Sequence, residues 1–74
     1  MSEEILHLLS NIVELPQVMK ADIDLRTYGL DSLKTMRLLV EIENVFNIEF
    51  DDDDLNMEEF STLERIVKKT LKLL

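Results

Sequence analysis

Residues 29–46 read GLDSLKTMRLLVEIENVF. After Asp31, five positions follow the i, i+3, i+4, i+7 and i+11 spacing that places side chains on one face of a helix. They are Thr35, Leu38, Leu39, Ile42 and Phe46. Asp is a favoured residue at a helix N-cap, because its carboxylate accepts a hydrogen bond from an otherwise unpaired backbone N–H. The stretch therefore predicts a helix that starts directly after Asp31 and buries this face.

The same helix carries a second apolar row, which consists of Leu33, Met36 and Val40. On a helical wheel this row lies to the side of the first, so we expect it to be partly exposed and available for contact with a partner. The alternative is that these three side chains belong to an ordinary core. On the first interpretation, one helix serves two surfaces.

Two more helical patterns flank this stretch. The first starts at Ser2, a good N-cap, and runs to about residue 14, with an apolar face of Ile5, Leu6, Leu9, Ile12 and Val13. The second starts near Ser61, which has capping-box spacing to Glu64. It continues with Leu63, Ile66, Val67, Thr70, Leu71 and Leu74.

The segments between these patterns lack a sustained period. Residues 15–30 hold the single Pro and the single Gly of the chain, and we expect a long ordered loop there. Residues 51–60 have room for a short helical turn, anchored by Leu55, Met57 and Phe60. The predicted fold is all-α: a small four-helix bundle of three main helices and one short helix, formed by residues 1–74 as a single domain.

The composition narrows the classes of partner. The 74 residues include eight Lys and Arg against sixteen Asp and Glu, a formal net charge of −8. This charge repels phosphate backbones and anionic lipid surfaces, so we expect neither nucleic acid nor a membrane as partner. No apolar run is long enough to span a bilayer and no signal segment follows Met1, which predicts a cytoplasmic protein. We expect it to be a monomer.

The chain offers little material for catalysis or metal binding. It has no Cys and a single His, His7, on the polar side of the first helix, so nucleophile–base arrangements are not expected. Seven carboxylates lie between positions 49 and 59, including Asp51 to Asp54. A calcium loop starting at Asp52 would need Gly at Met57 and Glu at Leu63, so no EF-hand register fits. We predict neither an enzyme nor a metal site.

One constellation remains, the run of Tyr28, Gly29, Leu30, Asp31, Ser32 and Leu33. Gly29 precedes Ser32 by three positions, where a missing side chain lets another backbone or a partner approach closely. A phosphoryl group on Ser32 would lie among the unpaired N–H groups and the positive end of the helix dipole. Asp and Ser at a helix start are also simple caps, so these residues by themselves leave both interpretations open.

The wider pattern resembles the acyl carrier protein family, which includes peptidyl carrier proteins. The attachment motif of that family is similar to Asp31-Ser32-Leu33, and further similar positions are Gly29, Leu30, Leu38, Ile42, Glu43, Phe46, Ile48 and Phe50. The resemblance covers nearly the whole chain. It implies a bundle of acyl-carrier type in which Ser32 receives 4'-phosphopantetheine from a phosphopantetheinyl transferase, with Asp31 and Gly29 beside the attachment point.

The resemblance also implies a function without an active site. The thiol of the arm would carry acyl or aminoacyl groups as thioesters between the loading and synthase enzymes of fatty acid, polyketide or nonribosomal peptide-type biosynthesis. Leu33, Lys34, Met36, Arg37 and Val40 would form the partner-binding surface. The alternative is a small acidic helical adaptor that binds a basic protein and carries no prosthetic group.

Two departures from the fatty-acid members stand out. Their surface beside the serine is typically acidic, whereas Lys34 and Arg37 occupy it here, and the connection from Phe50 to Phe60 is longer by a residue or two. Both favour a discrete carrier of a polyketide, nonribosomal peptide or amino-acid-activating pathway. Alternatively, Lys34 and Arg37 belong to a solvated helix face and pair with Glu41 or Asp31.

Overall fold

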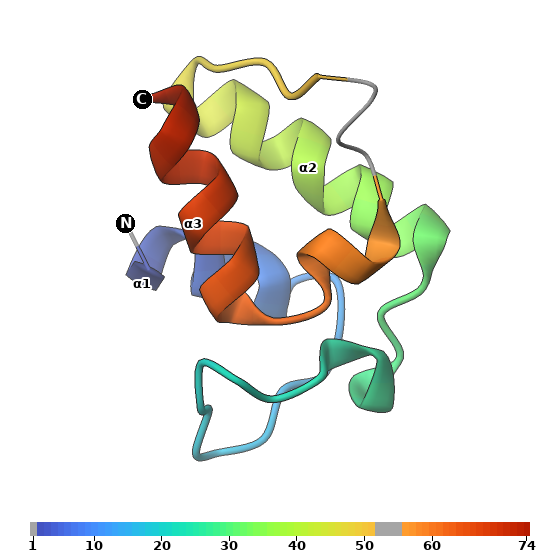
Figure 1. Cartoon of the computed structure of the whole chain (residues 1–74). Coiled ribbons are helices and arrows are strands. Elements are labelled where there is room, and N and C mark those ends of the chain that lie inside the picture. Colours follow the sequence, from blue (N-terminus) through green and yellow to red (C-terminus); the bar gives the residue numbers. More distant parts are fainter. Residues whose placement is uncertain (1, 52–55) are drawn as a thin grey trace.

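The computed structural model describes residues 2–51 and 56–74, and in this part of the chain it is helical without any strand (Figure 1). Three α-helices are present: α1 (Ser2–Ser10), α2 (Ser32–Phe46) and α3 (Leu63–Leu73). Within the described residues, two single turns of 3-10 helix lie between them, η1 (Leu25–Tyr28) and η3 (Met57–Phe60). The all-α prediction is confirmed, and the short fourth helix is a 3-10 turn.

The helices pack around a common interior. α1 packs against both α2 and α3, and η3 also packs against α2 and α3. In the view of Figure 1, the long loop that contains η1 extends below the three helices. None of the helices in the described residues is long and apolar enough to cross a membrane.

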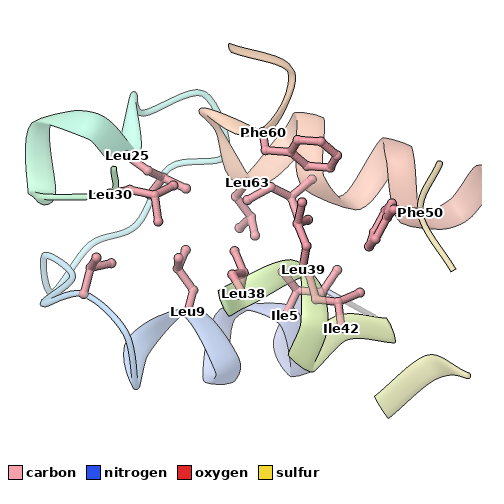
Figure 2. Packing of buried hydrophobic residues seen from close by; sticks show 12 residues of the cluster. Ile5, Leu9, Leu25, Leu30, Leu38, Leu39, Ile42, Phe50, Phe60 and Leu63 are labelled. Atoms are coloured by element: carbon pink, nitrogen blue, oxygen red, sulfur yellow. The ribbon is translucent and has the colours of Figure 1, made fainter. Parts of the chain in front are cut away.

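The core draws side chains from every element (Figure 2). Its buried apolar members are Ile5, Leu9, Val13, Leu25, Leu30, Leu38, Leu39, Ile42, Phe50, Phe60, Leu63 and Ile66. Phe50 and Phe60 meet edge to face, with ring centroids 5.6 Å apart. Burial of a side chain of this size contributes about 1.5–3 kcal/mol. The long loop is held in place because it inserts Leu25 and Leu30 into the same core.

α1 is shorter than the periodicity predicts, since it ends at Ser10 instead of near residue 14. The Ser10 hydroxyl donates a hydrogen bond to the carbonyl of His7 at 2.7 Å, and the Ile12 N–H donates to Leu9 at 3.0 Å. A hydroxyl that bonds to the backbone in this way competes with helix continuation. Val13 is buried all the same, because the turn after the helix directs it into the core.

The predicted capping box at the start of α3 is wrong. Thr62 is the N-cap, and its hydroxyl accepts from the Arg65 N–H at 3.2 Å. Ser61 is buried: its hydroxyl donates to the Glu58 carbonyl at 2.9 Å and its own carbonyl accepts from the Leu25 N–H at 2.7 Å. Ser61 thus closes η3 and holds the long loop, and the helix starts one residue later.

The predictions for the two connecting segments agree with the structure where it is described. Residues 15–30 form a loop, with η1 as a turn that the sequence pattern does not predict. The expected short turn near the end of residues 51–60 is η3, and its anchor Phe60 is fully buried. The side chains of Leu55 and Met57, the other two expected anchors, lie outside the described residues.

Candidate functional site

The segment before α2 is fixed at both of its ends. Leu25 and Leu30 are buried, and the Leu30 N–H donates to the Leu25 carbonyl at 3.2 Å. Asp24 caps η1, with its carboxylate accepting from the Arg26 N–H at 3.0 Å and from the Arg26 guanidinium at 2.7 Å. This hydrogen bond from Arg26 holds the pKa of Asp24 below its ordinary value. The loop therefore delivers the start of α2 to a defined place.

Gly29 is required by the backbone, for a reason different from the one expected. Its φ of 96° and ψ of 8° lie in the left-handed region, and its N–H donates to the Arg26 carbonyl to close η1. A β-carbon at this position would meet only the Nζ of Lys34, at 3.8 Å, within the described part of the chain. Glycine is therefore needed for its positive φ, and no close approach of another backbone explains it.

Asp31 caps α2, as predicted. Its backbone is extended (φ −112°, ψ −175°), its Oδ1 accepts from the Lys34 N–H at 2.8 Å, and its carbonyl accepts from the Thr35 N–H at 2.8 Å. These two bonds occupy the N–H groups of the third and fourth helical residues. The N–H groups of Ser32 and Leu33 precede the first intrahelical bond and have no acceptor within the helix.

Ser32 is the first residue of α2 and is exposed. Its position places the hydroxyl at the positive end of a helix of 15 residues. An anion attached to this oxygen would be stabilised by the helix dipole and by the two free N–H groups. The site thus suits a covalently attached phosphodiester.

The other titratable residue considered from the sequence lies elsewhere. His7 is exposed on α1 and lines a hollow of about 370 Å³ with Leu6, Pro16 and Met19 among others. Ser32 is not among the residues that line this hollow. The hollow beside the single histidine therefore does not include the serine.

The second apolar row of α2 is exposed, as predicted. Leu33 is 82% exposed, Met36 45% and Val40 50%. On the first row, Thr35, Leu38, Leu39 and Ile42 are buried and Phe46 is half-buried. The interpretation of the second row as ordinary core is wrong, because its side chains are exposed while those of the first row enter the core.

Two exposed basic side chains accompany this row. The Arg37 Nε lies 4.0 Å from the Glu41 Oε1, so the expected pair along the helix is present but long. Lys34 makes no ion pair within the described residues, and its ammonium lies beside Gly29 at the end of the helix. This placement of Lys34 is a feature of the site that the sequence pattern does not reveal.

No metal centre is found where the structure is described. Residues 2–51 and 56–74 hold no cluster of three or more His, Asp or Glu side chains that could bind a metal ion. Asp52, Asp53 and Asp54 of the acidic run lie outside the described residues.

The chain matches known proteins along most of its length. A sequence model of a family described as "Phosphopantetheine attachment site" matches residues 3–69. An aminoacyl carrier protein from Agrobacterium fabrum is 32% identical over 77 residues, which cover 100% of this chain and 92% of the relative.

Two further relatives are D-alanyl carrier proteins. The one from Leuconostoc citreum is 30% identical over 73 residues, covering 97% of this chain and 94% of the relative. The one from Leuconostoc mesenteroides is 31% identical over 75 residues, covering 100% and 96%. All three matches extend over both the serine region and the flanking helices.

Proposed function

Because the chain belongs to the family of proteins with a phosphopantetheine attachment site, we propose that Ser32 is the residue that carries this covalent cofactor. The observation that supports the assignment is the position of Ser32, an exposed hydroxyl on the first residue of α2. The donors around it also fit a phosphodiester, since the N–H groups of Ser32 and Leu33 have no helical acceptor. We further propose that residues 1–74 form a single carrier domain.

The modification makes and breaks one bond at phosphorus. The Ser32 Oγ attacks the phosphorus of coenzyme A that bears the pantetheine, and the bond from that phosphorus to the bridging oxygen breaks. Adenosine 3',5'-bisphosphate leaves, and the hydroxyl proton goes to a base. We propose that this base belongs to a phosphopantetheinyl transferase.

For the cargo, we propose an aminoacyl group. The relatives named above are carriers of aminoacyl and D-alanyl groups, and they cover nearly the whole chain. The terminal thiol of the attached arm would hold the group as a thioester. The protein itself then supplies the attachment point and a docking surface, and the enzymes that load and consume the cargo supply the catalysis.

The docking surface that we propose consists of the exposed row Leu33, Met36 and Val40 with the two cations Lys34 and Arg37. These side chains follow Ser32 along the same helix, so a bound enzyme would also reach the arm. Exposed apolar side chains on a helix favour contacts that form and break rapidly, and methionine adapts to differently shaped partners. That the protein acts as a cytoplasmic monomer stays a prediction.

The attachment residue is tested by mass spectrometry. Incubation with coenzyme A, Mg²⁺ and a transferase of broad specificity should add one phosphopantetheine to the wild type and none to Ser32→Ala. Ser10→Ala is the matched control, because Ser10 is also exposed but lies at the end of α1, and it should be modified like the wild type. A wild type that stays unmodified would support the alternative, an acidic adaptor without a prosthetic group.

The cargo is tested on protein purified from its native host. Intact mass before and after treatment with neutral hydroxylamine, which cleaves thioesters, gives the mass of the released group. An amino acid is expected. A fatty acyl or polyketide mass would overturn the aminoacyl assignment and leave the attachment at Ser32 intact.

A further inference from the structure

Lys34 lies two positions after Ser32 and extends back past the start of α2. Its ammonium lies 3.8 Å from the point that a β-carbon of Gly29 would occupy. Two positions along a helix correspond to about 200° of rotation, so side chains at Ser32 and Lys34 leave the helix on nearly opposite sides. The two side chains can therefore approach each other only in the space before the N-terminus of α2. Side chains of a helix do lean toward its N-terminus. The Lys34 ammonium lies beside Gly29, on the N-terminal side of α2.

The charges near Ser32 give the Lys34 ammonium a function at this place. The Asp31 carboxylate is adjacent in sequence, and it is held at the helix end by its bond to the Lys34 N–H at 2.8 Å. A phosphodiester on Ser32 would bring a second negative charge into the same space. Two like charges at close range disfavour the folded arrangement, whereas a nearby cation offsets the repulsion.

Of the two basic residues of α2, Lys34 and Arg37, Lys34 is the one closer to Ser32 along the helix. Arg37 lies more than one helical turn from the N-terminus of α2, and its Nε lies 4.0 Å from the Glu41 carboxylate. Lys34 has no ion-pair partner among the residues that the structure describes, and Gly29 presents no side chain between its ammonium and the turn before Ser32.

We propose that Lys34 is a positioning residue for the prosthetic group: its ammonium pairs with the phosphodiester on Ser32 and directs the root of the arm toward the Gly29 side of the helix end. This inference rests on the proposed attachment at Ser32. It assigns to Lys34 a function in the modified protein itself, before any enzyme binds.

The test compares the unmodified and modified forms of three proteins: wild type, Lys34→Met and Arg37→Met. Methionine keeps a long unbranched side chain and removes the charge, and Arg37→Met is the control for loss of one exposed cation from α2. Urea unfolding gives the equilibrium constant for each form. Measurements at about 0.01 M and about 1 M salt, where the screening length is about 30 and 3 Å, separate a charge effect from a packing effect.

At low salt, modification should stabilise the wild type relative to Lys34→Met by about two- to fivefold in the unfolding constant, the range of an exposed ion pair. The difference should vanish at high salt, and Arg37→Met should respond to modification like the wild type. The ³¹P resonance of the phosphodiester should move in Lys34→Met and stay unchanged in Arg37→Met.

The results also separate the two proposals. Intact mass first establishes whether each protein is modified at Ser32. If Ser32 is modified and Lys34→Met matches the wild type in both unfolding and ³¹P resonance, the pairing is overturned while the attachment stands. If Ser32 is not modified at all, both proposals fall together.

Discussion

The two apolar rows of α2 are made of the same kind of residue and have opposite surroundings. Leu38, on the first row, is fully buried, while Leu33, on the second row and 82% exposed, faces away from the bundle. The first row contacts the elements that form the core, and the second lies beside the proposed attachment residue. Hydrophobicity alone therefore does not identify the core residues of α2. The position of a residue around the helix axis decides whether its side chain is buried and stabilises the fold or is exposed and available to a partner.

The largest effect is expected from a matched pair of substitutions, Leu38→Ala and Leu33→Ala. Leu38→Ala should cost about 2–5 kcal/mol of the free energy of unfolding, through lost burial and the cavity that remains. Leu33→Ala removes the same atoms from a solvated position and should change the free energy of unfolding by no more than about 0.5 kcal/mol. Urea unfolding of both variants checks this. Equal losses would mean that the second row is buried and that the two rows do not differ.

Phe46 sharpens the same comparison. It belongs to the first row by periodicity, yet it is half-buried, whereas Leu39 is 2% exposed. Although phenylalanine is the larger residue, we expect the loss of stability in Phe46→Ala to be no greater than that in Leu39→Ala.

The residue at which α2 starts decides which of its side chains face the core. The next-largest effect on stability is therefore expected at the N-cap, Asp31. Asp31→Ala removes the acceptor for the Lys34 N–H and should cost about 1 kcal/mol. Asp31→Asn keeps an oxygen acceptor and should retain most of the stability, which makes it the control for charge. Thermal or urea unfolding of both variants distinguishes capping from charge. If Asp31→Asn lost as much as Asp31→Ala, the negative charge beside the helix dipole would be the main contribution.

The start of α2 could be predicted because its determinants are local. An Asp at the N-cap and a periodic run after it require no knowledge of the rest of the fold, and the rotation between the two rows follows from 3.6 residues per turn. The exposure of Leu33, Met36 and Val40 follows from the same geometry.

The start of α3 could not be predicted because a contact between distant segments sets it. Ser61 has suitable cap chemistry, but its carbonyl accepts from the Leu25 N–H and its hydroxyl closes η3, so the neighbouring Thr62 becomes the cap. Nothing in the spacing of Ser61 and Glu64 reveals a bond to a residue 36 positions earlier.

The features of the site also divide into those that the sequence predicts and those that it does not. Its residues Gly29, Asp31 and Ser32 stand out in the sequence, although Gly29 does so for a reason that only its positive φ reveals. The location of the Lys34 ammonium depends on four side-chain torsions and on the path of the preceding turn. Sequence periodicity places its Cα on the helix but cannot place its charge.

A smaller effect on stability is expected for Met36→Ala and Val40→Ala. Both side chains are about half exposed, so each truncation should cost under about 1 kcal/mol. The deficit should appear in the rate at which a transferase modifies Ser32, because that enzyme must contact the helix beside it. Initial rates measured by intact mass, alongside unfolding, separate the two effects. Unchanged rates for both variants would place the docking surface elsewhere.

The smallest effect on stability is expected for Arg37→Glu, and it tests the charge of the exposed row. The new carboxylate would face Glu41 one helical turn away, and like charges at this spacing cost about 0.2–0.5 kcal/mol. The substitution replaces the pair that now spans 4.0 Å, which is too long and too exposed to contribute much. Its main consequence should therefore lie in recognition.

A partner with an acidic patch should associate more slowly with Arg37→Glu, and a partner with a basic patch should associate faster, because charge at the edge of an interface acts mainly on the association rate. Arg37→Gln, which removes the charge without reversing it, should fall between the wild type and Arg37→Glu with both partners. The dependence of each rate on salt checks that the effect is electrostatic, since screening should bring the three proteins together. Rates that stay equal at low salt would show that Arg37 lies outside the interface, and the contacts of α2 would then be limited to its apolar row and to Lys34.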